Sequence, residues 1–155
     1  NEYLQFASSR STEKTETFDL SELLIDTIDK YEKKEIISNI PLRVYLDGRK
    51  NLIKRCIQNL IDNSIKYSNN ITVSLKKLEN SVTITVDDDG PGIPKNEREN
   101  VLKPFYKINK SRGDSKSSVG LGLSIASDIA RSHGGNLKLE NSPKNGLRVM
   151  IFLPF

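Results

Sequence analysis

The feature that most constrains the fold is a long amphipathic segment in the middle of the chain. Between residues 47 and 70, apolar side chains recur at intervals of three and four, the period of an α-helix with one buried face. Asp47 is a candidate N-cap, and Asn69-Asn70 is a candidate stop. Such a helix must bury its stripe against a second layer. The stripe consists of Leu52, Ile53, Cys56, Ile57, Leu60, Ile61 and Ile65.

Strands with period-two alternation are predicted to supply that second layer. Residues 71–78 and 81–87 read as one hairpin, and residues 136–141 and 147–155 read as another. Residues 36–47 are short and β-like. Strands that pair with their neighbours, mixed with a few helices, predict an α+β fold: a two-layer sandwich with a mixed or antiparallel sheet and helices on one face.

Two more helices and a short one complete the expected elements. Residues 19–35 have helical spacing, with Asp19 or Ser21 as the cap. Residues 121–135 are expected to form a helix that stops at Gly134-Gly135, and residues 96–102 a short helix. The segment 106–118 has almost no apolar content and is expected to be a mobile loop.

Composition excludes several functional classes. The chain has 155 residues and a net charge of +4 that is spread along it, with no Trp, so nucleic-acid binding is not expected. One cysteine and one histidine exclude an internal disulfide and make a His/Cys metal site implausible. Cys56 is expected to be a packed thiol. No apolar run is long enough to span a bilayer, so no membrane contact is expected of this segment.

Polar residues on the long helix form the first candidate site. Asn59, Asn63, Lys66 and Tyr67 recur at i, i+4, i+7 and i+8, so they share a face beside the apolar stripe. An Asn carbonyl oxygen suits Mg²⁺ that bridges phosphates, and Lys adds a positive charge. Taken alone, this face is better explained as the polar edge of an amphipathic helix.

The stretch Val86–Pro94 contains the second candidate. Gly90 and Gly92 allow the backbone to turn sharply at a strand end and to approach a flat ligand. A carboxylate beside that turn can accept a hydrogen bond from an exocyclic amine. Taken alone, the motif is better explained as a turn with solvated acids, and Asp87 and Asp89 are expected to be solvated.

Glycines before a helix form the third candidate. In "SVGLGLSIA" they leave N–H groups and the positive end of the helix dipole facing outward, as in a phosphate cradle. The preceding loop carries Lys107, Lys110, Arg112 and Lys116 and is expected to act as a lid over polyphosphate. An ordinary solvated connection is the alternative for this loop.

These motifs, in this order, resemble the ATP-binding domain of sensor histidine kinases over residues 18–155. "QNLIDNSIKYS" is similar to that family's N box, "DDDGPGI" to its G1 box, "KPFYK" to its F box and "GLGLSIA" to its G2 box. The same superfamily includes gyrase, the MutL-type repair proteins and a heat-shock chaperone. The resemblance implies a Bergerat-type fold with a flexible ATP lid. Two positions depart from the pattern: Leu102 stands where Phe is usual, and Ser118 where Gly is usual.

The resemblance also implies a role for each residue of the site. Asn63 would coordinate Mg²⁺, Asp88 would accept from the adenine amino group, and Asn59 and Lys66 would be the catalytic residues at the phosphates. Tyr67 would border the nucleotide. The residues expected to bind ATP are Asn59, Asn63, Lys66, Tyr67, Asp88, Gly90, Gly92, Ile93, Lys107, Lys110, Arg112, Gly120, Leu121, Gly122 and Leu123.

The resemblance further implies a place in a signalling protein. Residues 1–17 would be the end of a dimerisation and phosphoacceptor helix with its linker. Mg²⁺–ATP would supply phosphate to a histidine on that dimerisation domain, for relay to a response regulator. The parent would be a homodimer anchored in the membrane with this part in the cytoplasm, and the isolated segment would be a monomer. His133 is expected to cap a helix end and not to accept phosphate.

Two other functions remain open from the sequence. One is a superfamily ATPase of the gyrase or MutL type, although those relatives have Glu where Asn59 stands, and an amide cannot take a proton from water. The other is a regulator such as an anti-sigma kinase relative or a degenerate nucleotide-binding module. The intact Asn63, Asp88 and glycine pairs argue against degeneracy.

Overall fold

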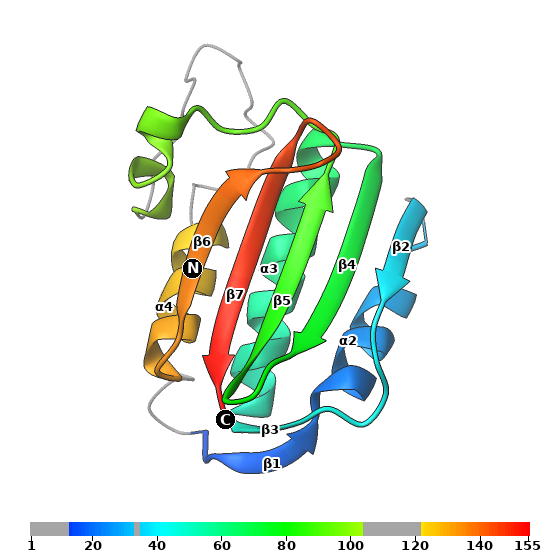
Figure 1. Cartoon of the computed structure of the whole chain (residues 1–155), viewed down its shortest axis with the longest axis vertical. Coiled ribbons are helices and arrows are strands. Elements are labelled where there is room, and N and C mark those ends of the chain that lie inside the picture. The colour runs from blue at the N-terminus through cyan, green and yellow to red at the C-terminus, as the bar shows by residue number, and fades with distance from the viewer. Residues whose placement is uncertain (1–12, 33–34, 104–121) are drawn as a thin grey trace.

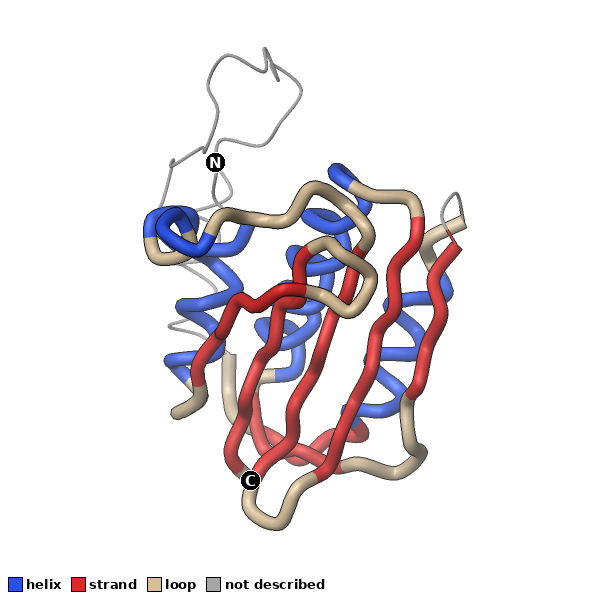
Figure 2. The backbone as a smooth tube through the Cα atoms, turned by 45° about the horizontal axis from the view of Figure 1, so that its top comes forward, coloured by secondary structure: helices blue, strands red, loops and turns tan. Residues whose placement is uncertain are grey.

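The computed structural model describes residues 13–32, 35–103 and 122–155, which form two layers. One layer is a five-stranded mixed sheet in the order β2-β4-β5-β7-β6. Helices α2, α3 and α4 all lie on one face of this sheet (Figures 1 and 2). The predicted α+β sandwich is therefore confirmed. The strands are β2 (Glu35–Asn39), β4 (Asn70–Lys77), β5 (Ser81–Asp88), β6 (Asn136–Asn141) and β7 (Leu147–Pro154), and the helices are α2 (Leu20–Asp29), α3 (Lys50–Tyr67) and α4 (Gly122–Ser132).

The core lies between the sheet and the three helices. Alternate residues of the central strands point toward the helices, and α3 runs along this face with its apolar stripe buried. Leu60 and Ile61 of α3 and Val149 of β7 are fully buried. Both predicted hairpins are present as antiparallel pairs, β4 with β5 and β6 with β7. The predicted helix at 121–135 is present as the slightly shorter α4.

A second, small sheet was not predicted. Strand β1 (Glu16–Asp19) pairs antiparallel with β3 (Tyr45–Gly48). The expected β-like segment 36–47 therefore divides between two sheets, because Pro41 and Arg43, whose φ is 61°, interrupt it. Strand β2 pairs in parallel with β4, which makes the large sheet mixed. The expected boundary between residues 17 and 18 falls inside β1.

Helix boundaries differ modestly from the sequence prediction. Helix α2 ends at Asp29, six residues before the predicted 35, and Asp19 is its N-cap because its carboxylate accepts from the Glu22 N–H at 3.0 Å. The predicted short helix at 96–102 is instead two 3₁₀ turns, Lys95–Glu97 and Asn100–Leu102.

The start of α3 is held by residues that are distant in sequence. Asp47 lies in β3 and does not cap the helix, whose N-cap residue Arg49 makes no side-chain cap bond. Instead, Glu13 Oε2 accepts from the Asn51 N–H at 2.7 Å, and its Oε1 accepts from the Leu52 N–H at 3.0 Å. The predicted cap was wrong because local sequence cannot show a carboxylate that arrives from the chain before β1.

His133 lies at the end of α4, as predicted. Its Nδ1 is 2.8 Å from the Ile129 carbonyl oxygen, and its Nε2 accepts the Arg49 N–H at 3.0 Å. The histidine therefore joins the last turn of α4 to the residue that precedes α3.

Candidate functional site

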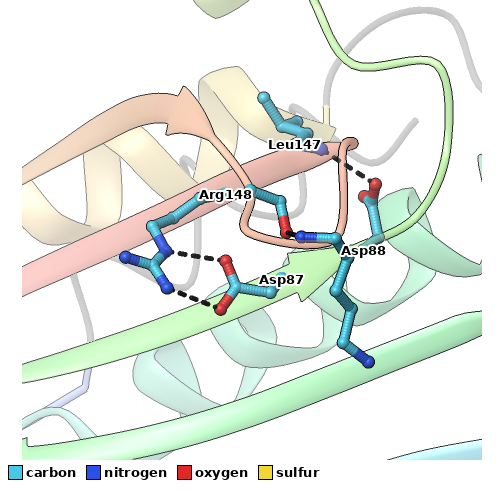
Figure 3. A network of polar contacts seen from close by, with 6 residues as sticks. Asp87, Asp88, Leu147 and Arg148 are labelled. Carbon is cyan, nitrogen blue, oxygen red and sulfur yellow. Dashed lines mark hydrogen bonds and ion pairs between the residues drawn. The ribbon is translucent and has the colours of Figure 1, made fainter.

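The end of β5 presents a carboxylate with one fixed oxygen. Asp88 is 3% exposed, and its Oδ1 accepts from the Gly90 N–H at 3.0 Å. The same oxygen accepts from the Leu147 N–H at 3.0 Å (Figure 3). The part of the chain that the structure describes places no donor on Oδ2. Since one oxygen is anchored by two backbone groups, the other keeps its capacity to accept from a ligand.

Glycines allow three segments to meet at Asp88. A Cβ on Gly90 would lie 2.7 Å from the Tyr67 carbonyl oxygen at the end of α3. A Cβ on Gly146 would lie 2.3 Å from the Asp88 carbonyl oxygen and 2.4 Å from its Oδ1. Gly92 has a φ of 73°, which side-chain-bearing residues rarely adopt. The end of α3, the turn after β5 and the turn before β7 are thus packed backbone to backbone.

The turn between β6 and β7 is a part of the site that sequence reasoning missed. The Ser142 N–H donates to the Gly146 carbonyl at 2.9 Å, and Asn145 has a φ of 71°. This conformation brings the Leu147 N–H to Asp88. The predicted hairpin of residues 136–141 and 147–155 implied only a connection at residues 142–146, and the position of this turn opposite Asp88 depends on strand order and register.

The acids that flank Asp88 stabilise the strands and turns around it. Asp87 is buried and lies on the opposite side of β5, where its carboxylate accepts from Arg148 Nε at 2.7 Å and Nη2 at 3.0 Å (Figure 3). This pair raises the pKa of Arg148. The expectation that Asp87 is solvated was wrong, because strand alternation places it against the neighbouring strand.

Asp89 is exposed as expected, but it is not merely solvated. It accepts from the Asn69 N–H at 3.3 Å, from the Asn70 N–H at 3.3 Å and from Asn70 Nδ2 at 2.8 Å. These bonds, chiefly the one from the Asn70 side chain, lower the pKa of Asp89. Asp89 therefore fixes the turn that joins α3 to β4.

The predicted polar face of α3 lies alongside this turn. Asn59 is 9% exposed, and its buried Nδ2 has no hydrogen-bond partner among the residues that the structure describes. Asn63 is half-buried. The Lys66 ammonium lies 5.5 Å from the centre of the Tyr67 ring, which is 40% exposed. The Tyr67 carbonyl oxygen lies against Gly90, two residues after Asp88. The C-terminal end of this face therefore adjoins Asp88.

The N-terminus of α4 lies beside the middle of α3. A Cβ on Gly122 would be 4.0 Å from the Asn59 carbonyl oxygen, and the Cys56 thiol lies 3.6 Å from the Ala126 carbonyl oxygen. The two helices are therefore antiparallel, and the positive end of the α4 dipole lies level with Asn59. Leu123 is buried in the core.

The other residues predicted to bind ATP lie apart from the polar face of α3 or outside the described part of the chain. Ile93 packs partly buried against the core. Five predicted residues lie outside the part of the chain that the structure describes, so their roles stay predictions. They are Lys107, Lys110, Arg112, Gly120 and Leu121.

The donor set fits magnesium better than a transition metal. The described residues contain no group of three or more His, Cys, Asp or Glu side chains that could hold a metal ion. The predicted metal ligand is the neutral amide oxygen of Asn63, which would suit a hard cation that takes its other ligands from phosphates and water. Burial raises the pKa of the Cys56 thiol to about 12, so it remains protonated.

No helix in the described part of the chain combines the length and the apolar content that crossing a bilayer requires.

Comparison with known proteins identifies the family. Residues 48–155 match the model described as histidine kinase-, DNA gyrase B-, and HSP90-like ATPase, so the chain belongs to this family. It is 38% identical to the sensor histidine kinase CpxA of Escherichia coli over 110 residues. This matched region is 70% of this chain and 24% of CpxA.

Similar solved structures narrow the assignment within this family. The histidine kinase domain of the E. coli osmosensor EnvZ is 32% identical, with a TM-score of 0.69 and coverage of 90% of this chain and 88% of that one. The ATP-binding domain of PrrB from Mycobacterium tuberculosis is 26% identical, with a TM-score of 0.73 and coverage of 90% and 96%. The chain is thus a histidine kinase ATP-binding domain, as the resemblance predicted, and it spans about a quarter of CpxA.

Proposed function

We propose that this domain binds Mg²⁺–ATP and passes the γ-phosphate to a histidine on a dimerisation domain, for relay to a response regulator. The observation that carries the proposal is the half-anchored carboxylate of Asp88, next to the polar face of α3 and the start of α4. Residues 1–17 would be the end of the dimerisation helix and its linker, and residues 18–155 the catalytic domain. The parent would be a membrane-anchored homodimer with this monomeric part in the cytoplasm.

Adenine would lie against the turn after β5. Asp88 Oδ2 can accept the exocyclic amine of adenine while Oδ1 keeps its two backbone bonds. Because Gly90 and Gly92 carry no side chain, the base can approach the backbone closely. Ile93 and Tyr67 would border the base.

The triphosphate would extend along α3 toward the start of α4. Asn63 would supply an amide oxygen to Mg²⁺, which neutralises charge on the phosphates when bound. Asn59 and Lys66 would contact the phosphates, together with the N–H groups at Gly120, Leu121, Gly122 and Leu123 at the helix start. The lid would add Lys107, Lys110 and Arg112.

Transfer to another domain is favoured over hydrolysis. Asn59 cannot accept a proton from water, so no general base for hydrolysis is present at that position. Both ring nitrogens of His133 are engaged, by the Ile129 carbonyl and the Arg49 N–H. The acceptor histidine is therefore expected on another domain.

Calorimetry and labelling test the proposal. Mg²⁺ should raise the affinity of the domain for ATP, and Asn63→Ala should remove most of that gain while leaving the Mg²⁺-free affinity nearly unchanged. Asn69→Ala, in the exposed turn, is the matched control. Radiolabelled ATP should leave no acid-labile phosphate on the isolated domain and should turn over slowly. Stable labelling of His133, or rapid hydrolysis, would contradict the proposed function.

A further inference from the structure

Two buried donors without acceptors lie one helical turn apart on α3. Within the described residues, Arg55 Nη1 and Asn59 Nδ2 are both buried without a hydrogen-bond partner, and Ser64 Oγ is the third such side-chain atom. Arg55 also appears in none of the ion pairs formed among these residues. Asn59 belongs to the polar face of α3 already described, whereas Arg55, one turn earlier, has been given no role.

An unpaired buried guanidinium N–H is costly to the protein. A buried donor that lacks an acceptor keeps its desolvation penalty, and the penalty is larger when the group is charged. Native proteins contain few such groups, and each requires an explanation, such as a catalytic role or an ion that binds there. Two of them on adjacent turns of one helix face indicate a shared anionic ligand.

The position of Arg55 fits the far end of a nucleotide. Arg55, Asn59 and Asn63 follow at i, i+4 and i+8 along one face, with about 6 Å between successive positions. Tyr67, at the C-terminal end of α3, contacts the Gly90 position beside Asp88. The base therefore belongs at the C-terminal end of the face, and the phosphate furthest from it belongs toward Arg55.

We propose that Arg55 is a further phosphate-binding residue, which contacts the terminal phosphate of ATP and so distinguishes ATP from ADP. This inference rests on the proposed function. A guanidinium is suited to the role because its planar fork can bond two phosphate oxygens at once. Once the terminal phosphate has been transferred, ADP has no group at this distance, and Arg55 favours exchange of product for substrate.

Calorimetry with ATP and with ADP at the same Mg²⁺ concentration tests this role. Arg55→Gln should weaken ATP binding by roughly 10- to 100-fold, the range typical of lost bonds to a charged group, and should change ADP binding little. Arg55→Lys keeps the charge and should restore part of the ATP preference. Lys54→Gln removes the same charge from a position about 100° around the helix and should leave the ratio of affinities unchanged.

The outcomes separate this inference from the proposed function. If the wild-type domain prefers ATP and Arg55→Gln removes that preference, the inference is supported. If Arg55→Gln weakens ATP and ADP equally, or weakens neither, Arg55 does not reach the terminal phosphate and the inference is wrong. A wild-type domain that binds neither nucleotide would overturn the proposed function itself. If Arg55→Gln does not fold, Arg55→Lys answers the same question, because it keeps the charge but loses the planar fork. Its preference for ATP over ADP should be reduced, and an unchanged preference would contradict the inference.

Discussion

The two ends of the candidate site are built in opposite ways. At the turn after β5, Asp88 is held by two backbone N–H groups, and glycines bring three chain segments into contact. On the polar face of α3, Asn59 and Arg55 have buried donors that find no acceptor among the described residues. At the first end the fold fixes one carboxylate oxygen of Asp88 and leaves the other to accept from a ligand. At the second end the donors of both side chains are still without acceptors among the described residues. Under the proposed function, the end that would bind the base is preorganised, and the end that would bind the phosphates is completed on binding.

The largest effect is expected from a methyl group at Gly146. Gly146→Ala places a Cβ 2.3 Å from the Asp88 carbonyl oxygen, so backbone must move and about 3 kcal/mol of unfolding free energy should be lost. Denaturant unfolding measures this loss. Gly122→Ala, at the other end, meets only an ordinary contact at 4.0 Å and should change stability by about 0.5 kcal/mol or less. Equal effects would contradict the contrast between the two ends.

A smaller loss is expected from the ion pair on the opposite side of β5. Asp87→Asn weakens two bonds to Arg148 and should cost about 2 kcal/mol of unfolding free energy. Because Asp87 points away from Asp88, ATP affinity should stay within a factor of about two, as expected for a residue outside the site. Measuring both the free energy of unfolding and the ATP affinity of Asp87→Asn distinguishes a role in stability from a role in binding. A large loss of ATP affinity would show that the ion pair between Asp87 and Arg148, on the opposite face of the sheet, also supports the site at Asp88.

Removing the cap at the start of α3 should lower the free energy of unfolding by a smaller amount. Glu13→Ala removes the carboxylate that caps the N–H groups of Asn51 and Leu52, at a cost of about 1 kcal/mol. Hydrogen exchange at those two amides should accelerate, while exchange near Asn63 should not. Glu16→Ala, on the adjacent strand, is the control and should leave both amides protected. Unchanged exchange in Glu13→Ala would mean that α3 is held by other contacts.

The smallest effect on the free energy of unfolding is expected from Asp89, and it depends on pH. The Asn70 side chain lowers the pKa of Asp89, so its contribution to stability is present above the ordinary value of 3.8 and is lost as pH falls through the lower folded value. The stability difference between the wild type and Asp89→Asn should therefore shrink in acid. A difference that persists at the lowest pH would assign the effect to something other than ionisation.

Local patterns predicted the elements and the residues of each motif, but not the contacts between motifs. Helical spacing was sufficient to place Asn59, Asn63 and Lys66 on one face, because that arrangement depends only on the helix period. Period-two alternation similarly predicted β4, β5, β6 and β7. These predictions needed no knowledge of which strand lies beside which.

The missed features all depend on distant chain segments. Gly146 is required because β7 lies beside β5 in one register, so the turn before β7 faces Asp88. Glu13 caps α3 from 38 residues away in sequence. Asp87 is buried because its partner Arg148 comes from the neighbouring strand. No local pattern carries this information, since each contact depends on the assembled sheet.

The central claim is that Asp88 selects adenine through its unanchored oxygen, and nucleotide preference tests this claim most directly. Guanine presents a carbonyl where adenine presents an amine, so wild-type Asp88 should reject GTP, with an affinity roughly 10- to 100-fold below that for ATP. In Asp88→Asn, Oδ1 can keep its backbone bonds while Nδ2 replaces the accepting oxygen. Calorimetry should then show that this preference is lost or inverted while the domain stays folded. Equal binding of ATP and GTP by the wild type, or a preference that Asp88→Asn leaves unchanged, would contradict the account.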